Sequence, residues 1–218
     1  MAHHGAHDEQ TAQCVTFQSS DMATTKSPPR RKTIKNVYQL HVQLLYVEPR
    51  VWRRLWVPDN LTLTDLDQVI QTAMGWTNSH LHEFEIDGQR YGMSLDEYPI
   101  DKPAKLDKDY RLSEVLSQHV KTFIYTYDFG DDWRHAVTVE QTLKPDPALN
   151  TWPQCLEGEN ACPPEDVGGV PGYMEFLEAV GDSTHEEHKA MRRWFGGLFD
   201  PKGFDINAVN IALRDVEI

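Results

Sequence analysis

Three histidines and two cysteines carry the side chains that a zinc site requires. His80 and His82 are two residues apart in a segment expected to be a strand, so both project from one face. His135 lies on another expected strand, and Cys155 and Cys162 lie in a loop rich in glycine and proline. Two thiolates and two imidazoles satisfy tetrahedral zinc, although the cysteine spacing is not that of a zinc knuckle. Alternatively, His82 and His135 are hydrogen-bonded core histidines and Cys162 is a small buried apolar residue.

Acidic residues gather at two expected turns. Asp128, Asp131 and Asp132 lie at one turn, and Glu165 and Asp166 lie at the other. If the two turns meet, their carboxylates form an oxygen-rich site suited to magnesium or manganese. Metal-assisted hydrolysis of a phosphodiester would then be chemically feasible. We favour the simpler interpretation, in which aspartate occupies tight turns because its side chain bonds the local backbone.

Trp76 and Trp133 lie beside expected turns and are candidates for the wall of a groove. The other aromatic residues are expected to form the core. With the acidic turns, the two tryptophans predict a binding surface. Its residues are Trp76, Glu83, Asp128, Asp131, Trp133, Glu165 and Asp166.

The elements that must position these residues follow from hydrophobic periodicity. Alternation in residues 38–44 and 51–57 predicts two strands. Thr62 is a suitable N-cap for a helix that ends at Gly75, and a further strand covers residues 80–86. This order of hairpin, helix and strand indicates a β-grasp-like N-terminal half.

The second half of the chain begins with two more strands, at residues 123–127 and 135–139. Residues 145–164 are expected to be mostly irregular. Three helices then follow, the last of them capped by Asp205. The predicted class is therefore α+β, with a mixed sheet and a helical C-terminal part.

Composition restricts where the protein works and what it binds. We expect residues 1–35 to be a disordered tail and residues 36–218 to form a single domain. The net charge of −13 repels a phosphate backbone, which argues against nucleic acid as a partner of the domain. No apolar run approaches the ~20 residues that span a bilayer, and the start of the chain lacks a signal peptide's apolar segment. These features predict a cytoplasmic protein that does not bind membranes.

Four motifs together resemble the plasmid pRiA4b ORF-like family. They are VEPRVWRR at 47–54, GW followed by HLHEF at 75–84, YDFGDDWRH at 127–135, and CPPEDVGG at 162–169. The resemblance covers about residues 38–213 and implies an α+β fold, but it supplies no mechanism. Some members carry a transposon-passenger, resolvase-like label. We reject recombinase activity for this chain, because Ser79 and Ser94 have no nearby arginine pair.

The sequence shows no assembled catalytic set. Cys162 precedes two prolines, so it does not lie at a helix N-terminus with free donors. Our first hypothesis is a non-enzymatic binding or interaction module of plasmid or mobile-element ancestry, with an unidentified protein or small-molecule partner. Its surface would combine residues 80–84, 128–135 and 155–169. The alternative is a metal-dependent, phosphodiester-type hydrolase that uses the same segments. Zinc is the candidate cofactor.

Overall fold

The computed structural model describes residues 1, 33–93, 104–116, 118–146 and 152–218. The chain divides into two units, residues 1–31 and 32–218. The predicted disordered tail therefore falls almost entirely outside the described residues.

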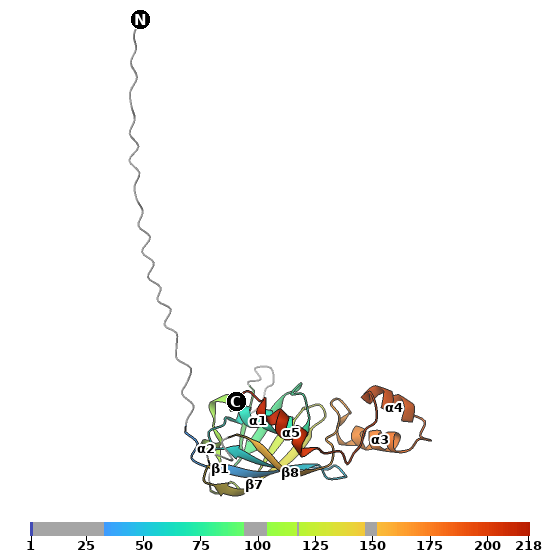
Figure 1. The fold of residues 1–218 in the computed structure, drawn as a ribbon, viewed down its shortest axis with the longest axis horizontal. Helices are drawn as coiled ribbons and strands as arrows, with labels where there is room; N and C mark the ends of the chain where they lie inside the picture. The colour runs from blue at the N-terminus through green and yellow to red at the C-terminus, as the bar shows by residue number, and fades with distance from the viewer. Residues whose placement is uncertain (2–32, 94–103, 117, 147–151) are drawn as a thin grey trace. The chain divides into compact units, whose positions relative to one another are not determined.

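One mixed sheet organises the second unit (Figure 1). Within the described residues it has the strand order β5-β4-β3-β6-β7-β1-β2-β8. Adjacent strands are antiparallel, except for the parallel pair β4 and β5. The strands are β1 (Val37–Leu44), β2 (Trp52–Pro58), β3 (His82–Ile86), β4 (Gln89–Gly92), β5 (Lys105–Leu106), β6 (Thr122–Tyr127), β7 (Trp133–Leu143) and β8 (Gln154–Glu159).

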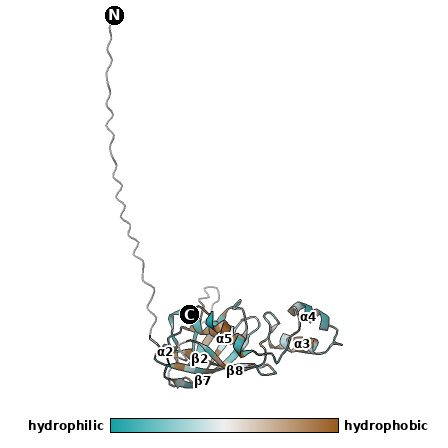
Figure 2. Cartoon of the chain, viewed as in Figure 1, coloured by the Kyte–Doolittle hydropathy of each residue, from teal (hydrophilic) through white to brown (hydrophobic). Residues whose placement is uncertain are grey.

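The helices complete an α+β fold, and the predicted helical C-terminal part is confirmed. They are α1 (Leu63–Met74), the short helix η1 (Asp107–Asp109), α2 (Leu112–Val115), α3 (Gly169–Gly181), α4 (His188–Phe195) and α5 (Ile206–Arg214). Helix α5 packs against both α1 and β8. Figure 2 shows apolar residues on the strands and on α5, whereas α4 is largely hydrophilic. In the described part of the chain, no helix is both long and apolar enough to cross a membrane.

Helix α1 begins and ends where the sequence predicts. The Thr62 hydroxyl accepts a hydrogen bond from the backbone of Asp65, whose carboxylate in turn accepts one from the backbone of Thr62. This capping box satisfies amide groups that the first turn leaves without helical partners. Gly75 ends the helix at φ 102°, a left-handed conformation that glycine adopts without steric cost. After Gly75 the chain continues directly into the segment that carries His80.

The prediction that residues 145–164 are mostly irregular is wrong for β8. Gln154–Glu159 pairs with β2, with a shift in register between Arg54 and Leu55. Cys155 is the buried residue of this strand, and its neighbours are partly or fully exposed. A strand at the end of a sheet with so little buried surface leaves no hydrophobic alternation in the sequence.

The topology does not show a β-grasp-like N-terminal half. Strand β1 lies between β2 and β7 and is antiparallel to both. Strand β3 joins the sheet between β4 and β6. Because β6 and β7 separate β3 from the first hairpin, the N-terminal strands do not form a separate subdomain.

Arg53 is a buried charge that connects distant parts of the second unit. Its guanidinium donates hydrogen bonds to the carbonyl oxygens of Ala73 at 2.8 Å, Glu159 at 2.9 Å and Asn160 at 2.9 Å. It also lies 4.3 Å from the centre of the Phe204 ring. These contacts join β2 to the end of α1, the end of β8 and the segment before α5.

Candidate functional site

The two acidic turns meet at His80. Its Nε2 atom lies 3.1 Å from Asp166 Oδ1, 3.6 Å from Asp128 Oδ2 and 3.9 Å from Glu165 Oε2. The His80 side chain is 30% exposed but its Nε2 atom is buried, and the 73% exposed side chain of Asp166 brings the cluster to the surface. Asp128 and Asp166 have φ values of 54° and 57°. Aspartate tolerates this left-handed conformation better than most residues, which explains its use at both positions.

Backbone contacts fix the two turns against each other. The amide of Gly168 donates a hydrogen bond to Asp131 Oδ2 at 3.2 Å. A Cβ atom on Gly169 would lie 2.6 Å from the Asp131 carbonyl oxygen, so only glycine permits this approach. The carboxylate of Asp131 therefore positions the loop, whereas those of Asp128 and Asp166 remain directed at His80.

Glu165 connects the same loop to the segment after α1. Its Oε1 atom accepts hydrogen bonds from the Thr77 amide at 2.8 Å and from the Tyr127 hydroxyl at 3.0 Å. Burial raises the pKa of Tyr127 and the nearby Glu165 carboxylate adds to this, so the hydroxyl stays protonated and donates. Trp76 Nε1 donates to the Pro163 carbonyl oxygen at 2.9 Å, which holds the loop at a second point.

A divalent cation fits the cluster of His80, Asp128 and Asp166. Each residue offers one ligand atom, and these atoms all lie within 4.8 Å of one another. With metal–ligand bonds of ~2.1 Å, opposite ligands around an ion are about 4.2 Å apart, so small side-chain rotations suffice. One imidazole and two carboxylates suit manganese, magnesium or zinc, and three protein ligands leave coordination positions open.

The structure does not gather the five predicted zinc ligands in one place. In the described residues, the one group of metal-ligating side chains contains His80 but none of the other four. His135 is fully buried, and its Nδ1 lies 3.2 Å from the Tyr125 carbonyl oxygen. Burial lowers the pKa of His135 to about 4, so the ring is neutral. Burial raises the pKa of Cys155 to about 11 and raises that of Cys162 as well. Both thiols are free, and their raised pKa values keep them protonated at neutral pH.

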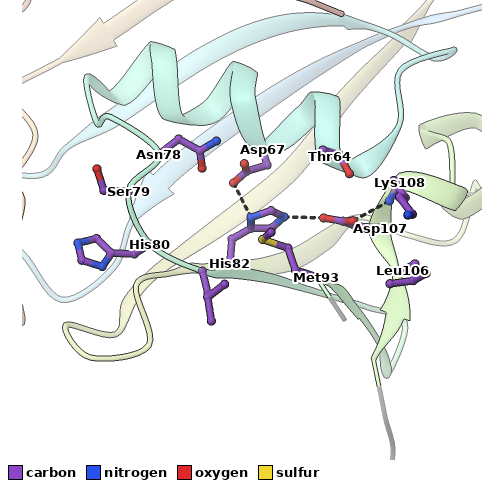
Figure 3. Close-up of a pocket in the computed structure, with 11 residues that line it drawn as sticks. Thr64, Asp67, Asn78, Ser79, His80, His82, Met93, Leu106, Asp107 and Lys108 are labelled. Carbon is purple, nitrogen blue, oxygen red and sulfur yellow. Dashed lines mark hydrogen bonds and ion pairs between the residues drawn. The ribbon is translucent and has the colours of Figure 1, made fainter. Parts of the chain in front are cut away.

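His82 lies in a buried polar network rather than beside His80 (Figure 3). Its Nδ1 is 3.2 Å from Asp67 Oδ1 and its Nε2 is 2.7 Å from Asp107 Oδ2. The three side chains are at most 5% exposed. Asp67 also accepts a hydrogen bond of 2.6 Å from the Tyr125 hydroxyl. Strand β3 begins only at His82, so the alternation rule that placed both histidines on one face does not extend to His80.

The two aspartates respond differently to this environment. Burial raises the pKa of Asp67, and His82 opposes that rise only in part. Burial also acts to raise the pKa of Asp107, but the hydrogen bond and charge of His82, together with hydrogen bonds from Thr64 and the Lys108 amide, lower the pKa overall. Asp67 was detectable in the sequence, because it interrupts the apolar face of α1 next to Leu66 and Ile70. Nothing in the sequence around Asp107 indicates its role.

A pocket of about 620 Å³ opens beside this network. Its walls come from α1, from residues 78–82 and from the segment Leu106–Lys108 (Figure 3). His80 and His82 both line it, so the pocket adjoins the cation cluster on one side and the buried network on the other.

None of the seven residues of the predicted binding surface lines this pocket. Trp133 is fully buried and Trp76 is 6% exposed, and their rings lie 6.1 Å apart. Trp133 is therefore a core residue and does not form the wall of a groove. Glu83 forms an ion pair with Arg90 on the adjacent strand.

Comparison with known proteins agrees with these motifs and with the fold. The family described as plasmid pRiA4b ORF-3-like protein matches residues 36–208. The chain belongs to this family, so the resemblance found in its motifs is confirmed.

Two relatives illustrate the similarity. The chain is 41% identical over 185 residues to the uncharacterized protein y4hQ of Sinorhizobium fredii (strain NBRC 101917 / NGR234), covering 84% of this chain and 93% of that one. It is also similar to the crystal structure of a protein of unknown function, MM3350, from Methanosarcina mazei Go1. That match has a TM-score of 0.73 and 37% identity, and covers 81% of this chain and 97% of the other.

Proposed function

We propose that the protein is a non-enzymatic binding module that holds its ligand through a divalent cation. The observation that carries this proposal is the convergence of three carboxylates from two turns on His80 Nε2, at 3.1–3.9 Å. His80, Asp128 and Asp166 would hold the ion, and the open coordination positions would accept oxygen atoms of the ligand. The family's plasmid name supports a mobile-element ancestry.

The pocket beside the cluster supports a small ligand. Asn78, Ser79 and Lys108 give its wall hydrogen-bonding groups and a positive charge, while Met93 and Leu106 contribute apolar surface. A ligand that bears a carboxylate or phosphate would coordinate the ion with its anionic end and occupy the pocket with the rest. This combination of an apolar wall with a few convergent polar groups is typical of small-molecule sites.

The states of the candidate nucleophiles favour binding over covalent catalysis. The Ser79 hydroxyl lies 2.7 Å from the Thr77 hydroxyl, and in the described residues it forms no hydrogen bond with a histidine ring. Both ring nitrogens of His82 face buried aspartates, so that ring has no free nitrogen for a substrate. The protonated thiols of Cys155 and Cys162 are weak nucleophiles.

Metal-dependent hydrolysis of a phosphodiester is the second candidate, and the position of Glu165 favours it. Its Oε2 atom lies 3.9 Å from His80 Nε2, next to the three proposed ligands. A carboxylate beside a metal-bound water is placed to accept a proton from it.

The proposal is tested by calorimetric titration of the full chain with Mn²⁺, Mg²⁺ and Zn²⁺. His3, His4 and His7 are replaced by alanine so that they contribute no binding. We expect one equivalent to bind, and Asp166→Asn to weaken binding at least tenfold. Asp132→Asn is the matched control, because the Asp132 carboxylate pairs with Arg134 in the same turn. Absence of binding, or equal binding by Asp166→Asn, would refute the cation site.

The same samples separate the two candidate functions. Hydrolysis of bis(p-nitrophenyl) phosphate is measured with the bound cation present. A metal-dependent rate that Glu165→Gln abolishes, with cation affinity retained, would establish the hydrolase and overturn the non-enzymatic module.

A further inference from the structure

A second pocket lies between α3 and α4 and has a distinct chemistry. It has a volume of about 240 Å³. Three carboxylates and three large apolar side chains dominate its lining: Asp166, Glu175 and Glu187 with Phe176, Met191 and Trp194. Such a pocket presents both negative charge and aromatic surface to one occupant.

We propose that this pocket binds an arginine side chain displayed by a basic partner protein. A guanidinium is a flat cation that stacks on aromatic rings and pairs with carboxylates in a fork geometry. The pocket supplies both kinds of contact. The inference goes beyond the cation-dependent module proposed above, because it concerns a different ligand at a different pocket.

The apolar part of the pocket is accessible to a ligand. Trp194 is 49% exposed and packs edge-to-face against Phe176, with ring centres 5.8 Å apart. Helix α4 has no buried residue along its length. An amphipathic helix normally buries its apolar face. A ligand stacked on Trp194 would cover surface that α4 leaves open.

Two of the three charges at the pocket, those of Glu175 and Glu187, are also available. In the part of the chain that the structure describes, neither Glu175 nor Glu187 forms an ion pair, whereas Asp166 pairs with His80. Glu187 is the N-cap of α4, and its spacing from Met191 and Trp194 places the three on one side of the helix. No basic residue of α4 lines the pocket. The chain's net charge of −13 adds a long-range attraction for a cation.

The experiment titrates the ¹⁵N-labelled full chain with N-acetyl-arginine amide, in EDTA so that no divalent cation contributes. The indole signal of Trp194 is assigned from Trp194→Phe. We expect a saturable shift of this signal with the arginine probe. N-acetyl-citrulline amide, which has nearly the same shape without the charge, should bind at least tenfold more weakly.

Variants of Glu175 and Glu187 test whether their negative charges are required for binding the arginine probe. The double change Glu175→Gln and Glu187→Gln should weaken binding at least tenfold without lowering the thermal midpoint. Glu178→Gln is the matched control, because Glu178 is exposed on α3 and does not line the pocket. Equal binding of the citrulline probe, unchanged binding by the double variant, or no saturable shift would each overturn the proposal. Asp166 lines this pocket and is also a proposed cation ligand, but every variant leaves it unchanged, so arginine binding and cation binding are tested separately.

Discussion

Replacing His82 by leucine tests whether this histidine compensates the buried carboxylates of Asp67 and Asp107. Leucine has a volume close to that of histidine, so the change removes the imidazole without leaving a large cavity. Asp67 and Asp107, at most 5% exposed, then lose their shared partner. Asp67 keeps the hydrogen bond from Tyr125, and Asp107 keeps the one from the amide of Lys108. Neither contact supplies a positive charge.

The expected loss of stability follows from the cost of neutralising one carboxyl. A buried carboxylate without a partner can take up a proton when the chain folds. Starting from an ordinary aspartate pKa of about 4, this costs about 4 kcal/mol at pH 7 and about 1.5 kcal/mol at pH 5. The first value agrees with the roughly 3–5 kcal/mol typical of breaking a buried ion pair from one side. Without His82, the folded-state pKa of a buried carboxyl is raised, so stability falls as pH increases.

The free energy of unfolding of each variant is measured by urea denaturation, monitored by tryptophan fluorescence. The reference is the triple variant Asp67→Asn, His82→Leu and Asp107→Asn, which keeps the shape but has no charge at these positions. We expect the single variant to be less stable than the triple variant by about 4 kcal/mol at pH 7, with the gap narrowing to about 1.5 kcal/mol at pH 5. Equal stabilities at pH 7, or a gap independent of pH, would refute the reasoning.

Two further outcomes check other parts of the structure. Gly169→Ala should lower the free energy of unfolding by about 2 kcal/mol or more, because the new Cβ meets a carbonyl oxygen at 2.6 Å in a left-handed backbone conformation. Gly197→Ala, in open space, should change it by less than about 0.5 kcal/mol in the same urea titration. In a Cys14→Ser background, Cys155 and Cys162 should react slowly with Ellman's reagent at pH 8 and about tenfold faster per added pH unit, because their raised pKa values leave little thiolate. Rapid, complete reaction of the folded protein at pH 8 would contradict this.

Local signals in the sequence predicted most of the regular elements. The alternation around Leu40 and Val42 gave β1, and Thr62 and Gly75 marked the ends of α1. Asp205 caps α5 as expected, with its carboxylate accepting from two backbone amides. These features depend on residues close together in the chain, which is why periodicity and capping rules detect them.

The site depended on contacts that no local rule describes. The sequence placed Asp128 and Asp166 in turns, but whether those turns meet depends on where β6, β7 and the loop before α3 lie in the folded unit. His80 and His82 were expected on one face, yet the strand starts between them and their side chains reach different neighbours. Asp107 follows the nearby two-residue strand β5, which is too short to produce a periodic signal.

The guanidinium of Arg53 makes the two ends of the second unit dependent on each other. Its acceptors at Glu159 and Asn160 and its aromatic neighbour Phe204 all lie more than a hundred residues downstream. Side-chain packing tightens this dependence, because a Cβ atom on Gly158 would lie 2.6 Å from the Phe204 ring. A nascent chain that has emerged only as far as β7 would keep the acceptor at Ala73 but would lack the acceptors at Glu159 and Asn160 and the Phe204 ring that complete the burial of Arg53. We therefore expect folding during synthesis to wait until nearly the whole chain has left the ribosome, and shortened versions that end before Gln154 to be substrates for chaperones and proteases.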